Sequence, residues 1–324
     1  MKHPYRIREI ARQAGLSEAT VDRVLHHRGG VRESTAGEVR RAIAALDQQQ
    51  ADAQLAGPAF PIDVVAAGPP RFTATLRHAV EAELPDLRPA VVKPRFHLGV
   101  ADIARALDRI GRSRSLGVIL TAPDTPEVVE AVGRLGRSVV TLGVDLPASK
   151  RIAYAGIDHA DAGATAAYLV EQWLADRAGD VLLARTADMD LDLGWTERAA
   201  GFRAEMATRA PHRRLLEGDA RTVLDGNPAV RAIYAPAPGG TTAVVEAFAA
   251  EQRNYDVFVA HDLDAENAEL LRTHKLSAVL HHDLAADLRF ACRTILRAQG
   301  ALAGPVRPQP TAIQVITPFN APIL

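Results

Sequence analysis

Cysteine, aromatic residues and long apolar runs are all scarce in this chain of 324 residues. The single cysteine, Cys292, excludes an intramolecular disulfide, as is usual for proteins of reducing compartments. Neither an N-terminal signal-type segment nor an apolar run of about 18 residues occurs, so we expect a cytoplasmic protein with no membrane partner. Apolar neighbours such as Phe290 and Ile295 predict that Cys292 is a buried helical residue and not a nucleophile.

The sequence motifs of common enzymes are also missing. There is no G-x-G-x-x-G or G-x-x-x-x-G-K loop for nucleotides, no G-x-S-x-G nucleophile turn and no phosphate loop of the sugar-kinase type. No set of Cys, His, Asp or Glu has the spacing of a zinc site. We therefore predict no catalytic residue, no metal and no cofactor.

What is present begins with two short amphipathic segments joined by a glycine. Apolar residues recur at helical spacing in both segments: Ile7, Ile10, Ala11 and Ala14 in the first, and Val21, Val24 and Leu25 in the second. Gly15 permits a tight turn between the segments, and Ser17 can cap the second helix. A third helix, from about Glu33 to Leu46, would close a small core. The pattern predicts a helix-turn-helix head whose second helix enters the major groove of DNA.

The charge of the chain is divided unevenly between this head and the rest. Through Leu46 there are nine Lys and Arg against five Asp and Glu, a net charge of +4, which leaves −5 for the remainder of a chain whose total is −1. A positive head on an acidic body favours phosphate contact by the head. On the second helix Glu18, Ala19, Asp22 and Arg23 are predicted to face the bases, and Ser17 and Thr20 are also predicted to contact DNA. The candidates for phosphate contact are the arginines Arg6, Arg12, Arg28 and Arg32.

These residues carry a family resemblance. The run IREIARQAGLSEATVDRVL from Ile7 to Leu25, followed by Val31-Arg32-Glu33-Ser34-Thr35, resembles the head of the lactose-repressor (LacI/GalR) family. The resemblance implies a transcriptional regulator, most often a repressor, that binds operator DNA as a homodimer, with a tetramer also open. It implies further that the rest of the chain resembles a type I periplasmic sugar-binding protein.

The segment after the head is predicted to be a linker or hinge. Residues 47–58 are polar and end at Gly57-Pro58, which breaks regular structure. In the resembling family a short hinge helix here inserts a leucine into the minor groove. The Tyr-x-Pro-Asn sequence of that segment is absent, so a wedge role for Leu55 and a plain tether both remain open. We divide the chain into a head (1–47), a linker or hinge (48–60) and a body (61–324).

The body alternates short apolar runs with amphipathic helical stretches, which is typical of an α/β fold with parallel sheets covered on both faces. About a dozen such strands predict two doubly wound lobes. The expected strands cover residues 62–67, 116–120, 139–142, 152–157, 181–184, 232–235, 257–260 and 277–280, and the clearest helices cover 160–175, 197–207, 241–250 and 284–298.

Polar side chains follow many of these strands, where parallel sheets bind ligands. Carboxylates accept hydrogen bonds from paired hydroxyls, arginine donates two, and an aromatic ring can stack on a sugar. This set predicts a pocket for a small sugar or polyol. The candidate ligand residues are Phe72, Asp124, Asp145, Trp195, Arg198, Asp262 and His281. The resemblance adds that Arg198, in Arg-x-x-Gly-Phe, binds sugar hydroxyls, and that Asp262 and Phe72 match a binding aspartate and a stacking aromatic.

Several alternatives stay open at this point. Asp124 is as well explained as a helix cap, and Asp158 is better explained as one. Pentoses, hexoses and cyclitols all fit the expected pocket, with a purine as a lesser option. A sugar-processing enzyme of the isomerase or aldolase type, using Asp and His at the strand ends, is the alternative function.

Overall fold

The computed structural model describes residues 5–26, 28, 30–55, 59–186, 193–305 and 311–322. Its contacts divide the chain into two compact units. The first consists of residues 1–59 with 88–91, and the second contains the rest of the chain. None of the described helices is long and apolar enough to cross a bilayer.

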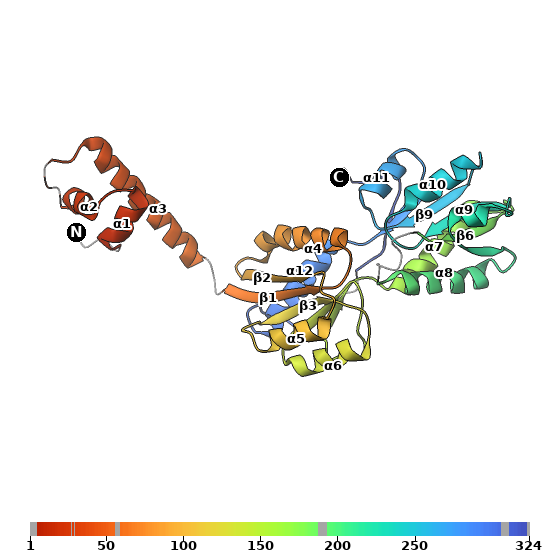
Figure 1. Cartoon of the computed structure of the whole chain (residues 1–324), viewed down its shortest axis with the longest axis horizontal. Coiled ribbons are helices and arrows are strands. Elements are labelled where there is room, and N and C mark those ends of the chain that lie inside the picture. Colours follow the sequence, from red (N-terminus) through yellow and green to blue (C-terminus); the bar gives the residue numbers. More distant parts are fainter. Residues whose placement is uncertain are drawn as a thin grey trace. The chain divides into compact units, whose positions relative to one another are not determined.

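The head contains the two predicted short helices and their turn (Figure 1). Helix α1 spans Ile7–Ala14 and α2 spans Glu18–Leu25. Gly15 ends α1 with a left-handed backbone at φ 67°, which a residue with a Cβ adopts only at a cost. Ser17 caps α2 by accepting a hydrogen bond from the backbone N–H of Thr20 at 3.2 Å. The expected turn geometry is confirmed.

A third helix, α3, spans Glu33–Leu55 and so continues beyond the predicted end at Leu46. Residues 47–55, predicted to be linker, are helical, because they are rich in Ala, Gln and Leu and the first breakers are Gly57 and Pro58. The three helices of the head enclose a core of their own. It consists of five buried residues from the three helices: Ile10, Ala11, Val21, Val39 and Ala42.

The first lobe of the body is built on a five-stranded sheet of order β2-β1-β3-β4-β5. Its strands are β1 (Ala59–Ala66), β2 (Val91–Leu98), β3 (Gly117–Thr121), β4 (Ser138–Leu142) and β5 (Ala153–Ala155). Neighbours from β1 to β5 pair in parallel. Its helices are α4 (Pro70–Glu83), η1 (Leu84–Leu87), α5 (Ile103–Gly111), α6 (Pro126–Leu135) and the late helix α12 (Leu284–Ala298).

Alternate residues of these strands pack against different helices. Val118 and Leu120 of β3 face α5 and α6, where they join Leu107 and Val132 in one apolar cluster. On the other face α12 lies so close that a Cβ on Gly117 would come within 2.5 Å of Ile295. Both faces are therefore covered, as the continuous apolar strands predict.

The second lobe is built on a six-stranded sheet of order β11-β10-β9-β8-β6-β7. Its strands are β6 (Asp180–Ala184), β7 (Leu215–Gly218), β8 (Val230–Ala235), β9 (Val257–His261), β10 (Ala278–His281) and β11 (Gln314–Ile316). All neighbours are parallel except β10 and β11. Helices α7 (His159–Leu174) and α8 (Trp195–Arg209) cover one face, and α9 (Ala220–Leu224), α10 (Thr241–Ala250) and α11 (Ala265–Arg272) cover the other.

Three of the observed strands, β2, β7 and β11, were not predicted from the sequence. All three lie at the edges of their sheets, and β11 is only three residues long. Strand β2 carries Lys93, Pro94 and Arg95, so it lacks the apolar run of a strand buried on both sides. The buried helical position predicted for Cys292 is confirmed, and burial raises the pKa of its thiol to about 12.

Candidate functional site

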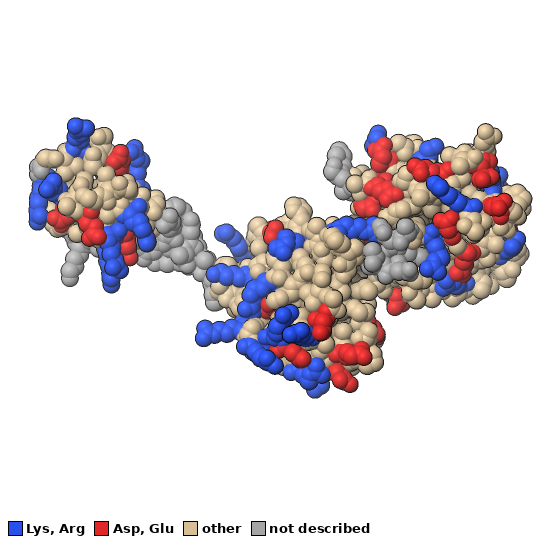
Figure 2. Space-filling view, viewed as in Figure 1, with Lys and Arg blue, Asp and Glu red and all other residues tan. Residues whose placement is uncertain are grey.

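The predicted DNA-contacting residues lie on or beside α2. Glu18 and Ala19, at its N-terminal end, are exposed, as is Arg23 one turn further along. Thr20 is half-buried, and its hydroxyl lies 2.8 Å from that of Ser17, so these two side chains also hold the start of the helix. Arg6, Arg28 and Arg32 are exposed around it, and Figure 2 shows Lys and Arg spread over the surface of this unit.

Asp22, predicted to read a base, already has partners on its own unit. Its carboxylate accepts a hydrogen bond from Arg28 at 2.9 Å and lies 3.0 Å from Nδ1 of His26. Both partners are more than half exposed, so these contacts are open to exchange with water or DNA. The proposed wedge, the side chain of Leu55, lies outside the described residues, as do residues 56–58 of the linker.

A cavity of about 480 Å³ opens between residues that follow the strands of both lobes. Four of the candidate ligand residues line it together: Phe72, Arg198, Asp262 and His281. Side chains that the sequence did not single out also line it, chiefly Arg71, His159, Asp264 and His282.

Arg198 reaches the cavity because α8 packs unusually closely on α7. A Cβ on Gly201 would lie 2.0 Å from the carbonyl oxygen of Ala160, and one on Gly163 would lie 1.9 Å from that of Arg198. Only glycine allows this approach. Phe202, the next residue, is fully buried and stacks on Tyr234 with ring centroids 4.7 Å apart. The Arg-x-x-Gly-Phe sequence thus fixes the helix that carries the arginine.

The guanidinium of Arg198 is held from two sides. Its side chain is 2 % exposed, and Nε donates a hydrogen bond to the carbonyl of Pro236 at 2.5 Å. Nη1 lies 3.1 Å from Nδ1 of His159, which must accept, so the ring proton of His159 lies on Nε2 and is donated to the carbonyl of Gly143 at 2.5 Å. Burial and the nearby charge of Arg198 lower the pKa of His159 to about 4.

Asp262 follows β9 in a backbone conformation that few side chains adopt, with φ at 60°. Its N–H donates to the carbonyl of Leu280, which holds the turn beside β10. Its Oδ1 is buried without a hydrogen-bond partner among the described residues. Burial alone would raise the pKa of this carboxyl, but the surrounding His261, His282 and Arg198 hold it at about 2.

Two histidines beside Asp262 differ in their partners. His281 accepts a hydrogen bond at Nδ1 from the N–H of Leu263 at 3.2 Å, and burial lowers its pKa. His282 donates from Nδ1 to Asp287 at 2.9 Å, and Thr311 donates to the other oxygen of that carboxylate. Burial opposes a charge on His282, but the hydrogen bond to Asp287 and the charge of Asp262 raise its pKa.

The first lobe supplies the apolar wall of the cavity and one hydrogen bond to the second lobe. Phe72 lies at the start of α4, packed beside Gly68. Nη2 of Arg71 donates to the carbonyl of Pro238 in the second lobe at 2.9 Å. The cavity therefore has an aromatic side and a charged, hydrogen-bonding base.

The other candidate ligand residues do not line this cavity. Asp124 is exposed, and the cap of α6 that it was thought to supply comes from Thr125. Asp145 turns away to pair with Arg151, at 2.6 Å between Oδ2 and Nη2, because Gly143 and Val144 take its place in the lining. Trp195, the first residue of α8, is half-buried and packs against the apolar core beneath α7 and α8.

Asp158 is an N-cap as expected: it accepts the N–H of Asp161 at the start of α7. His159 had no sequence signal of its own, and His282 was noted after a strand end but was not chosen as a ligand residue. The first gains its role only where α7 meets the end of β4, and the second lies one residue beyond β10, where the alternation of a strand no longer governs it. Among the described residues no group of three or more His, Cys, Asp or Glu is arranged to hold a metal ion.

Comparisons with known proteins agree with both halves of this description. Residues 106–298 match the family model of the periplasmic binding protein domain, and residues 6–48 match that of bacterial regulatory proteins of the lacI family. No curated protein sequence gives a significant match. The chain thus belongs, through its body, to the periplasmic binding protein domain family, and its head is a DNA-binding domain of the lacI family of bacterial regulatory proteins.

Solved structures share the fold of the body at low sequence identity. A glucose-galactose binding protein from Geobacillus stearothermophilus superposes with a TM-score of 0.66 at 20% identity, over 82% of this chain and 100% of its own. An arabinose binding protein from the same organism gives 0.66 at 17%, over 81% and 98%. A protein assigned to the LacI transcriptional regulators, from Bacteroides fragilis, gives 0.67 at 14%, also over 81% and 98%.

The two matched domains define the class of activity. A helix-turn-helix head of the lacI family on a periplasmic binding protein domain makes a ligand-responsive, DNA-binding regulator. The sugar-processing enzyme considered from the sequence has no support in these matches.

Proposed function

We propose that the ligand is a small sugar or polyol and that it binds in the cavity beside Arg198. The observation that carries this is that one cavity holds both a buried guanidinium and a buried carboxylate oxygen of Asp262 that has no hydrogen-bond partner among the described residues. Vicinal hydroxyls satisfy both groups at once, since each hydroxyl accepts from the arginine and donates to the carboxylate.

The remaining lining gives the ligand its orientation. His281 accepts at Nδ1 from the backbone, so its proton lies on Nε2 and is available to a hydroxyl oxygen. Phe72 supplies the apolar face against which the C–H groups of a sugar ring pack. The names of the glucose-galactose and arabinose binding proteins, which share this fold, are in keeping with such a ligand.

We propose further that the protein is a cytoplasmic homodimer that acts as a repressor. One head covers too little DNA for a specific site, and two heads on paired half-sites supply the missing contact. Ligand binding would change operator affinity by favouring one arrangement of the two lobes. The protein would bind its ligand without turnover, with no cofactor and no metal.

A thermal-shift screen against pentoses, hexoses and cyclitols tests the ligand. A compound at about one hundred times its Kd stabilises the folded state by about 2.7 kcal/mol, which is a clear shift in Tm. The ligand should be recovered unchanged after incubation with the protein. A panel in which no sugar or polyol shifts Tm, while a purine does, would overturn the proposed ligand class.

Selection of bound sequences from random duplex DNA tests the operator. We expect a two-fold symmetric site whose half-sites lie about one helical turn or a multiple of it apart, and sedimentation should give the mass of a dimer. An asymmetric site bound by a monomer would overturn the homodimer.

A further inference from the structure

The parallel strands of the five-stranded sheet begin along one edge of it, and at that edge two loops lie beside the start of β1. The N–H of Leu116 donates to the carbonyl of Pro61 at 2.9 Å, and Gly117 pairs with Ile62 on one side and Ser138 on the other. The loops that precede β3 (residues 112–116) and β4 (residues 136–137) therefore lie beside the start of β1. That strand is where the chain enters the body from the DNA-binding head.

This edge is basic. The two loops carry Arg112, Arg114 and Arg137, all exposed, and no Asp or Glu. Among the described residues none of these three arginines has an acidic partner, although Nη2 of Arg137 donates to the carbonyl of Ser113 at 3.0 Å. Figure 2 shows Lys and Arg gathered on this part of the first lobe. We call the three arginines the basic edge.

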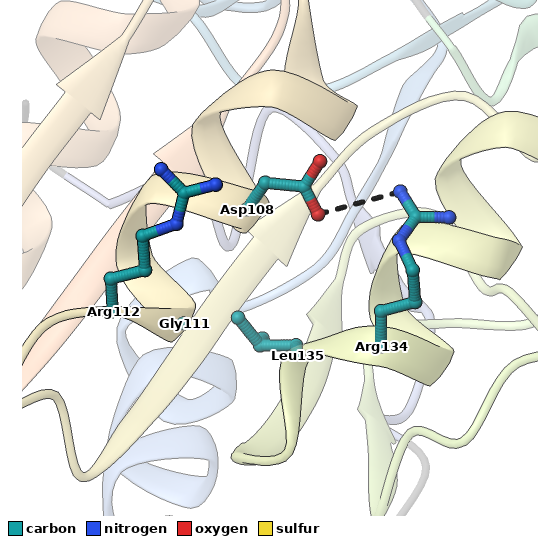
Figure 3. A pocket seen from close by; sticks show the side chains of 5 residues that line it. All are labelled: Asp108, Gly111, Arg112, Arg134 and Leu135. Atoms are coloured by element: carbon teal, nitrogen blue, oxygen red, sulfur yellow. Dashed lines mark hydrogen bonds and ion pairs between the residues drawn. The ribbon is translucent and has the colours of Figure 1, made fainter.

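A hollow of about 450 Å³ adjoins the basic edge, between the ends of α5 and α6 (Figure 3). Arg112 lies on one side of it and Arg134 on the other, with Leu135 between them. Arg134 is paired with Asp108 at 3.4 Å, so Arg112 is the arginine at this hollow that has no acidic partner.

The nearby carboxylate of β1 does not offset this charge. Asp63 is 2 % exposed and is already engaged by Arg95 at 2.6 Å and by His97 at 2.7 Å. Arg95 also donates to the hydroxyl of Ser113, which ties this neutralised group to the loop before β3.

The same edge of the other lobe is built differently. Its loops before β6, β8 and β9 carry the acids Asp176, Asp225, Glu251 and Asp256. Asp256 pairs with Arg177 at 2.9 Å and with Arg231 at 2.8 Å. Basic residues near the ends of helices stabilise the helix dipole in either lobe, but that role does not require that the loops before β3 and β4 be free of acids.

We propose that the basic edge contacts the DNA backbone beside the site that the head reads. The charge, the exposure and the lack of acidic partners suit phosphate oxygens, and the covalent entry of the head at this edge keeps bound DNA in reach. The inference rests on DNA binding by the head. The body then adds sequence-independent affinity, which is expressed as a steeper dependence on salt.

The test compares salt slopes of the full-length protein on a random-sequence duplex of about 40 base pairs. The triple variant R112Q/R114Q/R137Q removes the basic edge. Each lost phosphate contact lowers the slope of log affinity against log salt by about 0.9, so the triple variant should lose up to about 3 for each protomer bound. The control R214Q/R221Q/K275Q removes the same charge from exposed positions of the other lobe and should keep the wild-type slope.

Hydroxyl-radical footprinting on the selected operator gives the second readout. Wild type should protect backbone positions outside the major-groove sites, and the edge variant should lose that protection while keeping protection at the sites themselves. An edge variant with the wild-type slope and footprint would overturn the proposal. Equal losses of slope in the edge and control variants would also overturn it, because the effect would then be one of net charge.

Discussion

The head and the cavity of the body hold their charged side chains in opposite ways. On the head, Asp22 and Arg28 pair while their side chains stay 31% and 64% exposed. In the cavity Arg198 is 2 % exposed, and Oδ1 of Asp262 is buried without a hydrogen-bond partner among the described residues. An exposed ion pair contributes little and exchanges readily, whereas the loss of a contact to a buried polar group is costly. Sequence-independent DNA affinity should therefore vary with salt, and ligand binding should depend on a few buried atoms.

The largest effect expected from this difference between exposed and buried charges is that of removing the side chain of Arg198. Arg198→Ala should weaken ligand binding by about 2–5 kcal/mol, because the ligand groups that accept hydrogen bonds from the guanidinium would stay buried without a donor. Operator affinity in the absence of ligand should not change, since the head has its own core. Calorimetric titration with the compound found by thermal shift measures ligand binding, and a gel-shift assay measures operator affinity. The matched control is the exposed Arg221→Ala, and wild-type affinity in Arg198→Ala would place the ligand elsewhere.

A buried neutral histidine of the cavity makes the free energy of unfolding depend on pH, an effect that the exposed charges of the head do not produce. The pKa of His159 is lowered from 6.5 to about 4. Between these two pH values the histidine is therefore mostly protonated in the unfolded chain and mostly neutral in the folded protein. The stability that this histidine contributes is full above pH 6.5 and is lost as the pH falls toward 4, by roughly 3 kcal/mol at about 1.4 kcal/mol per pKa unit.

His159→Gln isolates this effect, since glutamine can still donate to the carbonyl of Gly143 but does not titrate. We expect its free energy of unfolding to fall less steeply than that of wild type between about pH 6.5 and 4, in urea titrations at each pH. His212→Gln, at an exposed position, is the control. Parallel curves for wild type and His159→Gln would contradict the assigned tautomer and its environment.

The close packing of α7 and α8 can be tested with a pair of glycines. Gly201→Ala would put a Cβ 2.0 Å from the carbonyl of Ala160, so it should cost about 1–3 kcal/mol of stability and weaken ligand binding by shifting Arg198. Gly133→Ala, in α6 with nothing within 4 Å, should instead stabilise by about 0.5–1 kcal/mol. Thermal unfolding compares the two, and equal effects would show that α8 has room to move.

The sequence predicted the parts of this protein that local pattern controls. The helix-turn-helix follows from Gly15 and Ser17, and the central strands follow from their apolar runs, because both signals lie within a few residues of the chain. Arg198 and Asp262 were found through a motif and a strand end. His159 was not, because its role depends on the carbonyl of Gly143 in another element. Edge strands such as β2 were missed because one side meets water and weakens the pattern.

On the head, Arg23 is where a specific contact is proposed. Arg23→Ala should cost about 1–3 kcal/mol of operator affinity and relax sequence preference, because an arginine that pairs with guanine distinguishes bases as well as phosphates. The measurement is the ratio of affinities for the selected operator and for random DNA. Arg12→Ala, at an exposed position of α1, should lower both affinities alike. An unchanged ratio for Arg23→Ala would assign that side chain to the backbone.

The smallest expected effect concerns Asp22. Its pair with Arg28 is exposed on both sides, so Asp22→Asn should change the free energy of unfolding by less than about 1 kcal/mol. The substitution also removes a negative charge from the helix that faces DNA and releases Arg28 for a phosphate. We therefore expect tighter binding to random duplexes and a salt slope steeper by about 0.9 for each protomer bound. If Asp22 instead accepts from cytosine N4, operator affinity should fall while affinity for random DNA rises, and the two titrations together separate these roles.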